Sequence, residues 1–142
     1  MELSHCIYSS RSTDSELSSQ ALAAILEQSR INNHKLNITG ILLFDSGTFF
    51  QVLEGDRAII EKVYDHITKD SRHDQVVKLI CEPIEERNFG EWSMGYPKVT
   101  KKELQNIDGL NDFFTQGNSF VDLEAGRAKT LLAAFKKGKW HY

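Results

Sequence analysis

The chain has 142 residues, of which 40% are hydrophobic and 26% charged, a composition typical of one ordinary globular domain. Its formal net charge of −3 argues against a general nucleic-acid binder, which normally presents a basic face. No apolar run approaches the ~18 residues that a membrane-spanning helix needs, and the N-terminus lacks the layout of a signal peptide. We therefore expect a cytoplasmic protein without direct contact with a membrane or a nucleic acid.

The two cysteines, Cys6 and Cys81, both fall in apolar segments that read as strands. The sequence contains no Cys-x-x-Cys motif and no Cys/His cluster. Because zinc sites and disulfide-rich folds normally show such spacings, we expect neither a metal site nor a disulfide framework.

The first strand is expected at residues 3–9, with Ser4, Cys6 and Tyr8 on one face. A helix should begin near Thr13 or Asp14, because either side chain can cap its free N–H groups. That helix should bury a stripe at helical spacing and end in the polar cluster of residues 30–35. The stripe consists of Leu22, Ile25, Leu26 and Ser29.

The next segment, residues 37–55, predicts a hairpin, since two apolar runs flank the turn sequence Asp-Ser-Gly at residues 45–47. Alternation in the second strand places Phe49, Gln51 and Leu53 on one face. A glutamine between two apolar neighbours costs a few kcal/mol unless its amide finds hydrogen-bond partners. The sequence therefore predicts a polar group opposite Gln51.

A second helix is expected to be capped by Asp56 and to run to about Asp70. Its apolar stripe at helical spacing consists of Ile59, Ile60, Val63, Tyr64 and Ile67. Residues 76–81 and 89–96 predict a fourth and a fifth strand. The order β-α-β-β-α-β-β indicates an α+β, ferredoxin-like sandwich with two helices on one face of a five-stranded mixed sheet. We expect the first and third strands to be parallel central neighbours, which brings Tyr8 close to Gln51 and makes its hydroxyl the expected partner of the Gln51 amide.

The chain changes character after residue 98, and we expect a domain of residues 1–98 followed by a helical extension, 99–142. A short helix is predicted at 101–106, a loop at 111–119 and a last helix at 120–137. The last helix has a narrow apolar seam, formed by Val121, Ala125, Ala128, Leu132 and Phe135. This extension should pack on the sheet or on a partner.

Several polar residues converge on the space between the two helices. Tyr8, Gln51, Asn32 and Asn33 offer hydroxyl and amide groups that suit the edge of a flat heteroaromatic ligand. Each also has a structural interpretation: Tyr8 and Gln51 as satisfied core residues, and the two asparagines as a helix stop. The residues alone thus indicate a planar ligand with a polar edge and do not identify it.

Taken together, five motifs resemble the BLUF domain, a blue-light sensor that uses FAD. They are IYSS around Tyr8, Asn32-Asn33, TGILLF, FFQVLEG around Gln51, and NFGEWSM around Trp92 and Met94. The resemblance covers about residues 2–98, in the family's order and spacing. The remaining residues resemble the helical extension of short BLUF proteins, which have no fused output domain.

The resemblance implies a role for each matched residue. Tyr8 would donate an electron and a proton to the excited flavin. Gln51 would link Tyr8 to the flavin N5 and C4 carbonyl, and would rotate or change tautomer, which shifts the absorption to the red. Asn33 would hold the C4=O/N3 edge, with Asn32 beside it.

Other matched residues are assigned less closely by the resemblance. Arg30, Arg72 and His73 would face the ribityl phosphates, and Ile25 would complete the binding set. Trp92 and Met94 would form a switch segment in the fifth strand, and the resemblance does not say which of them faces the flavin. The implied cofactor is FAD, with FMN or riboflavin as alternatives.

These assignments predict a light-switched interaction module, not an enzyme, that signals through the fifth strand and the extension to a partner protein. The apolar seam of the extension, which ends in the basic residues 136–140, is a candidate partner surface, and homo-oligomers are expected. Two alternatives remain, a flavin-dependent electron-transfer enzyme and a ferredoxin-like interaction module without a light response. The enzyme would need a site for a nicotinamide or another electron donor, and the sequence contains no Gly-x-Gly-x-x-Gly motif.

Overall fold

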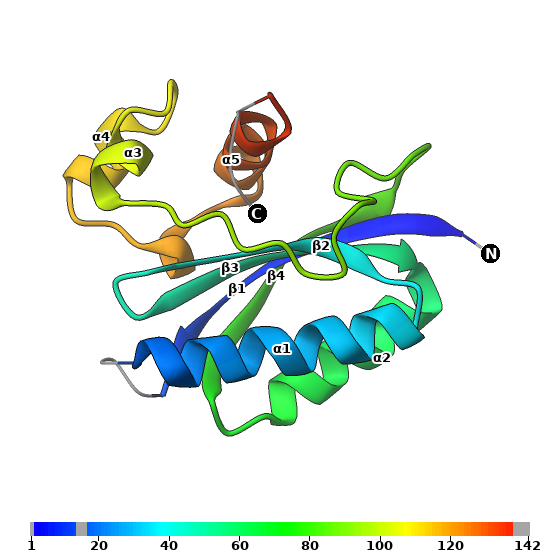
Figure 1. Ribbon diagram of the computed structural model, residues 1–142. Coiled ribbons are helices and arrows are strands. Elements are labelled where there is room, and N and C mark those ends of the chain that lie inside the picture. Colours follow the sequence, from blue (N-terminus) through cyan, green and yellow to red (C-terminus); the bar gives the residue numbers. More distant parts are fainter. Residues whose placement is uncertain (1, 14–16, 138–142) are drawn as a thin grey trace.

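The computed structural model describes residues 2–13 and 17–137 (Figure 1). Four strands form one sheet: β1 (Leu3–Ser12), β2 (Thr39–Asp45), β3 (Thr48–Asp56) and β4 (His73–Pro83). Two long helices, α1 (Ser19–Lys35) and α2 (Arg57–Lys69), cover one face of this sheet (Figure 1). The other face carries α3 (Lys101–Gln105), α4 (Asn111–Thr115), a 3-10 turn η1 (Phe120–Asp122) and α5 (Ala125–Lys137).

The sheet has the order β2-β3-β1-β4, and every neighbouring pair of strands is antiparallel. The α+β, ferredoxin-like class is therefore confirmed, with β1 and β3 at the centre. The expected parallel pairing of β1 and β3 is wrong. The α1 crossover makes β2 parallel to β1, and the tight hairpin then reverses the chain, so β3 must run against β1.

The β2–β3 hairpin is confirmed in detail. Ser46 and Gly47 both have positive φ angles, of 52° and 74°, as a two-residue hairpin turn with a right-handed twist requires. The two faces of β3 separate as the alternation predicted. Phe49 and Leu53 pack toward α1 and α2, whereas Phe50 and Val52 pack toward the C-terminal elements.

The predicted fifth strand, residues 89–96, is not a regular strand, and the five-stranded sheet is not confirmed. Ile41 and Gly95 form a single parallel bridge at the free edge of β2. Backbone hydrogen bonds from the Gly40 and Leu42 amides to the carbonyls of Trp92 and Gly95 hold the segment there. The pairing stops after this bridge, where side chains of α1 bond the carbonyls of Ser93 and Met94.

The start of α1 lies later than predicted. Ser18 caps the helix, and its hydroxyl accepts from the Ala21 amide at 3.1 Å. Thr13 instead follows β1, which continues to pair with β4 as far as Ser12, and its hydroxyl donates to the Ser71 carbonyl. Strand pairing thus overrides the capping signal at Thr13, while Asp14 lies outside the described residues. The Asp56 cap of α2 is confirmed.

The fourth strand is longer than the predicted 76–81, since β4 pairs with β1 almost throughout its length. This register places Cys6 directly opposite Cys81, with Cα atoms 4.1 Å apart, and the two are joined by a disulfide. The sequence was expected to lack a disulfide framework, and this single bond was not predicted. The two residues are 75 positions apart in sequence, and only the β1–β4 register brings them together.

The C-terminal elements build one apolar cluster against the sheet. Phe50 and Val52 of β3 contact a group of buried aromatic and aliphatic side chains: Phe113, Phe114, Phe120, Leu123, Leu131 and Phe135. The predicted loop at 111–119 contains α4, and the predicted last helix is interrupted by extended backbone at Leu123. In the predicted seam, Ala128, Leu132 and Phe135 are buried, whereas Ala125 is exposed.

None of the helices in the described part of the chain combines the length and apolarity that spanning a bilayer requires. Within the same residues, no group of three or more His, Cys, Asp or Glu side chains could hold a metal ion.

Candidate functional site

A pocket of about 690 Å³ lies between α1 and α2, above the sheet. Residues of α1 and α2 form its walls, and Leu42 of β2 and Gln51 of β3 contribute from the sheet. Of the predicted binding residues, Ile25, Asn32, Asn33, Gln51, Arg72 and His73 line the pocket, whereas Tyr8 and Arg30 do not. The sequence interpretation missed the remaining lining residues, which are Gln28, Ser29, Lys35, Leu36, Leu42, Val63, His66, Ile67, Lys69 and Asp70.

Helical spacing could have revealed several of the missed residues. Gln28 and Ser29 lie one turn after Ile25 and one turn before Asn32, so they share the inner face of α1. Val63 and Ile67 belong to the predicted apolar stripe of α2, which was assigned to the core alone. A stripe that faces another helix across a sheet can line a pocket as well as a core.

Tyr8 and Gln51 lie directly opposite each other in the β1–β3 register. Both are nearly inaccessible, with 1% and 7% of their surface exposed. The Tyr8 hydroxyl nevertheless has no hydrogen-bond partner in the described structure. The expected bond between the two side chains is therefore absent. A buried hydroxyl without a partner costs about 1–3 kcal/mol, so this group needs a partner that the protein does not supply here.

The surroundings of Tyr8 also control its proton. Burial, and to a smaller degree the neighbouring Tyr64, raise the pKa of the Tyr8 hydroxyl well above its ordinary value. The two rings meet edge to face, with centroids 5.6 Å apart. Tyr8 is consequently a neutral phenol at any physiological pH, with its proton available to donate.

Asn32 and Asn33 occupy the last turns of α1 and do not follow the helix. Asn33 is buried, and its side-chain N–H donates to the Ser93 carbonyl at 2.7 Å. Asn33 also lines the pocket, so it contacts both the pocket and the segment beside β2. Asn32 is exposed and lines the pocket from the same end.

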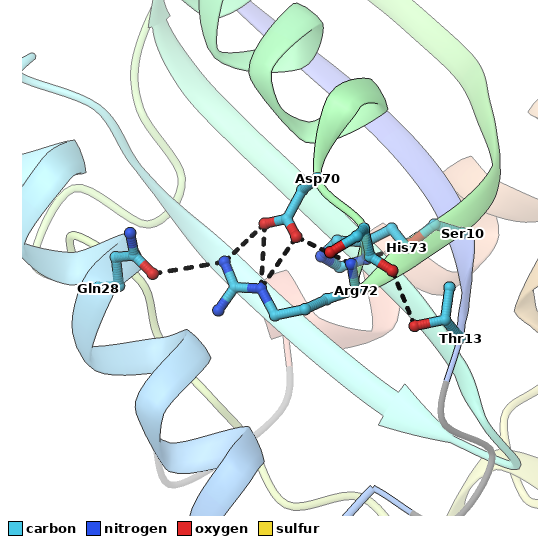
Figure 2. Close-up of polar contacts among 7 residues, drawn as sticks. Ser10, Thr13, Gln28, Asp70, Arg72 and His73 are labelled. Carbon is cyan, nitrogen blue, oxygen red and sulfur yellow. Dashed lines mark hydrogen bonds and ion pairs between the residues drawn. The ribbon is translucent and has the colours of Figure 1, made fainter.

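One end of the pocket carries an ion pair, which Figure 2 shows between Asp70 and Arg72. An Arg72 Nη2–Asp70 Oδ2 contact of 2.6 Å and further bonds from Nε join the two side chains, and Gln28 of α1 lies 3.4 Å from the guanidinium. The Arg72 hydrogen bonds lower the pKa of Asp70 to about 2. The predicted phosphate-facing arginine is thus at the pocket, but Asp70 holds it.

His73 lies at the start of β4 and lines the pocket. Its Nδ1 atom is 3.1 Å from the Ser10 hydroxyl, and its ring packs on Phe49 with centroids 4.8 Å apart. Figure 2 shows His73 beside Ser10. Burial lowers the pKa of His73 below its ordinary value, against an opposing effect of Asp70. A neutral imidazole at this position can accept or donate a hydrogen bond without adding charge.

Arg30 does not reach the pocket, and its assignment to the ribityl phosphates is not supported by its position. Its Nε atom donates to the Met94 carbonyl at 2.8 Å. The side chains of Met94 and Trp92 pack on opposite faces of the sheet. Met94 is buried in the cluster that contains Tyr8, whereas Trp92 packs against the C-terminal cluster.

Comparison with known proteins identifies the family. A family model described as "BLUF: Sensors of blue-light using FAD" matches residues 3–95. The chain is 34% identical over 118 residues to the photoactivated adenylate cyclase subunit alpha of Euglena gracilis. It is also 34% identical over 91 residues to the blue light- and temperature-regulated antirepressor BluF of Escherichia coli (strain K12). These matches span 82% and 64% of this chain but only 12% and 22% of the relatives.

Two solved structures of similar size have the same fold. The ground state of BlsA superimposes with a TM-score of 0.81 at 27% identity, over 99% of this chain and 91% of BlsA. The dark state of the BLUF protein BlrB gives a TM-score of 0.69 at 32% identity, over 94% and 97% of the two chains. The chain therefore belongs to the BLUF family, whose members sense blue light with a bound flavin.

Proposed function

We propose that the pocket between α1 and α2 holds the flavin and that Tyr8 and Gln51 are its photoactive partners in this chain. The observation that carries this proposal is the buried Tyr8 hydroxyl without a partner, opposite a glutamine that lines the pocket. A ligand that accepts a hydrogen bond, directly or through a turned Gln51, removes the cost of leaving this hydroxyl unpaired.

The residues fit a flavin. The pocket volume lies within the ~300–1,000 Å³ range of cofactor sites. Gln51 and Asn33 offer amides to a ring edge that alternates N–H and C=O groups, and Ile25 offers an apolar surface to a ring face. Lys69 and Arg72 lie at the pocket and can compensate the charge of phosphates.

A bound flavin supplies the absorption of blue light and a ring edge that attracts electrons and protons more strongly on excitation. Tyr8 remains protonated because its pKa is raised, and its hydroxyl can donate to the Gln51 carboxamide. An amide presents a donor on one side and an acceptor on the other, so a turned Gln51 exchanges the groups that it offers. Two alternative hydrogen-bond arrangements give the local, bistable change on which a switch depends.

We assign FAD as the cofactor, with FMN and riboflavin as the alternatives that a binding experiment separates. If Lys69 and Arg72 contact phosphates, then FAD and FMN should bind more tightly than riboflavin. An Arg72→Ala variant should lose most of this preference. Equal affinities for all three flavins would show that the phosphates are not recognised.

We further propose that residues 1–98 form the flavin-binding domain and 99–142 an extension that transmits the signal. The packing of α3, α4 and α5 on the sheet face opposite the pocket supports this division. Within the candidate partner surface, Ala128, Leu132 and Phe135 of the seam are buried in the C-terminal cluster, and the basic end at residues 138–140 lies outside the described residues. The partner, self-association and the absence of an enzymatic activity are parts of this proposal, since the relatives include both small sensor proteins and cyclase subunits.

The expected cytoplasmic location is also a proposal, and the disulfide makes it testable. Disulfides are rare in the reducing cytosol. If the protein is cytoplasmic, thiol labelling in rapidly quenched cells should find Cys6 and Cys81 largely reduced, and the bond should form after purification.

An absorption spectrum before and after blue light tests the proposed function. Protein purified with FAD should show flavin bands that shift to the red under blue light and return in the dark. Bands that bleach and stay bleached, together with oxidation of added NADH, would instead indicate an electron-transfer enzyme. Failure to bind FAD, FMN or riboflavin would remove the flavin from this pocket.

A further inference from the structure

We infer that Arg30 is a positioning residue, which holds the segment of residues 92–95 against α1 and thereby keeps Met94 on the pocket side of the sheet. The segment lies at the edge of β2, where a regular fifth strand is absent. This inference rests on the proposed function only for its consequence in the light, since the contacts themselves exist without a ligand.

The four carbonyls of residues 92–95 all accept hydrogen bonds, two from β2 and two from α1. The outer two, of Trp92 and Gly95, accept from backbone amides of β2 at 3.0 and 2.8 Å. The inner two accept from side chains of α1: Ser93 from Asn33 at 2.7 Å and Met94 from Arg30 at 2.8 Å. Because the inner carbonyls point to the helix, they are not available for a ladder, and the segment cannot continue as a strand.

This arrangement fixes which side chain faces the pocket side. Met94 is buried, at 1% exposure, in the cluster that contains Tyr8, and its carbonyl is bonded to Arg30. Trp92 packs against the C-terminal cluster. A displacement of the segment that exchanges Trp92 for Met94 must break the Arg30 bond. A guanidinium donor makes the stronger class of hydrogen bond, so Arg30 stabilises the arrangement with Met94 inside.

Replacing Arg30 should affect the segment of residues 92–95 without affecting the pocket, whereas replacing Asn33 should affect both. Asn33 both lines the pocket and bonds Ser93, so its replacement would change flavin binding and segment position together. Arg30 bonds the segment and does not line the pocket. Its replacement should therefore release the segment while leaving flavin affinity unchanged. The phosphate contact that the family resemblance suggests for Arg30 predicts the opposite result.

The experiment compares Arg30→Ala, Arg30→Lys and Arg72→Ala. Amide hydrogen exchange is measured at Gly40, Leu42 and Gly95, whose N–H groups all bond across the β2 edge. In Arg30→Ala these amides should exchange at least about tenfold faster in the dark, with and without FAD, because a charge-assisted bond is lost. The amides between β1 and β3 serve as an internal control and should not change. Arg30→Lys should restore part of the protection.

A second measurement follows the exchange of the same three amides under blue light. Blue light should raise exchange at these three amides in the wild-type chain, and this increase should shrink in Arg30→Ala, where the segment is already released. FAD affinity should stay within about twofold of the wild type in Arg30→Ala and fall in Arg72→Ala. A Trp140→Phe background leaves Trp92 as the only tryptophan, whose fluorescence should change in Arg30→Ala in the dark.

Two results would overturn the inference. The first is unchanged exchange at Gly40, Leu42 and Gly95 in a folded Arg30→Ala protein. The second is a loss of FAD affinity in Arg30→Ala as large as that in Arg72→Ala. Failure of the proposed function has a different signature: the wild-type chain would show no red shift, while the exchange difference between Arg30→Ala and the wild type in the dark would persist.

Discussion

The two faces of the sheet are completed in different ways. On one face, the chain itself fills the space, since Phe114, Phe120 and Phe135 share one buried cluster with residues of β3. On the other face, α1 and α2 leave a pocket of about 690 Å³ beside Gln51 and a buried hydroxyl on Tyr8. The same alternating strand, β3, supplies both surfaces. The difference indicates that one face serves stability and the other is built for a ligand.

The segment of residues 92–95 joins these two faces. It contributes Met94 to the pocket-side cluster and Trp92 to the C-terminal cluster. A change in hydrogen bonding at the pocket can therefore reach the C-terminal elements through a short piece of backbone that contacts both clusters. The comparison predicts that spectral effects and stability effects can be separated by mutating one face or the other.

The largest expected effect is on the photochemistry, through the pocket face. Tyr8→Phe removes only the hydroxyl, so the flavin should remain bound while the light-induced red shift is abolished. Gln51→Leu should have the same effect. The measurement is the difference spectrum between illuminated and dark protein. Tyr64→Phe is the matched control, since Tyr64 contacts the Tyr8 ring but is not the tyrosine paired with Gln51. A normal red shift in Tyr8→Phe would contradict the assigned network.

The sequence predicted the parts of this pocket face that depend on local pattern. Alternation placed Gln51 toward the helices, the apolar stripe placed α2, and the turn residues placed the hairpin. The position of Tyr8 opposite Gln51 also followed from the order of the elements, although the direction of the strands was wrong.

Features that depend on tertiary contacts could not be predicted in the same way. The fifth strand is lost because Arg30 and Asn33 bond its carbonyls, and no local propensity encodes that competition. The disulfide depends on the β1–β4 register between residues 75 positions apart. Asp70 was read as the end of a helix, and its pairing with Arg72 follows from the turn between them.

The next largest effect should come from the C-terminal face. Phe114 is 1% exposed and contacts the rings of Phe113 and Phe120. Phe114→Ala should lower the free energy of unfolding by about 3–5 kcal/mol, because it leaves a cavity in this cluster. Denaturant unfolding measures this loss, and the red shift should persist where the protein is folded. Phe114→Leu, which keeps most of the volume, should cost less. A large spectral change with little loss of stability would contradict the separation of the two faces.

Reduction of the Cys6–Cys81 disulfide should have a somewhat smaller effect on stability. The bond closes a loop of 75 residues and restricts the unfolded chain. Its removal, by reductant or in a Cys6→Ser/Cys81→Ser variant, should lower the free energy of unfolding by about 2–4 kcal/mol. The two treatments should agree, and adding reductant to the double variant should have no further effect. Two titratable thiols in the oxidised, denatured protein would show that the bond does not form.

The smallest expected effect is a pH dependence of stability that arises at the edge of the pocket. Burial holds the pKa of His73 below its ordinary value of 6.5, and Asp70 and Arg72 are its charged neighbours. At a pH between the folded and the unfolded pKa of His73, the imidazole is protonated in the unfolded chain and neutral in the folded one. The contribution of neutral His73 to the free energy of unfolding is therefore complete above about pH 6.5 and declines as the pH falls through that value. His73→Asn cannot titrate, and its unfolding free energy should therefore decline less between pH 7 and 5 than that of the wild type. An identical decline in His73→Asn would assign the pH dependence to other groups and leave His73 with only its contacts to Ser10 and Phe49.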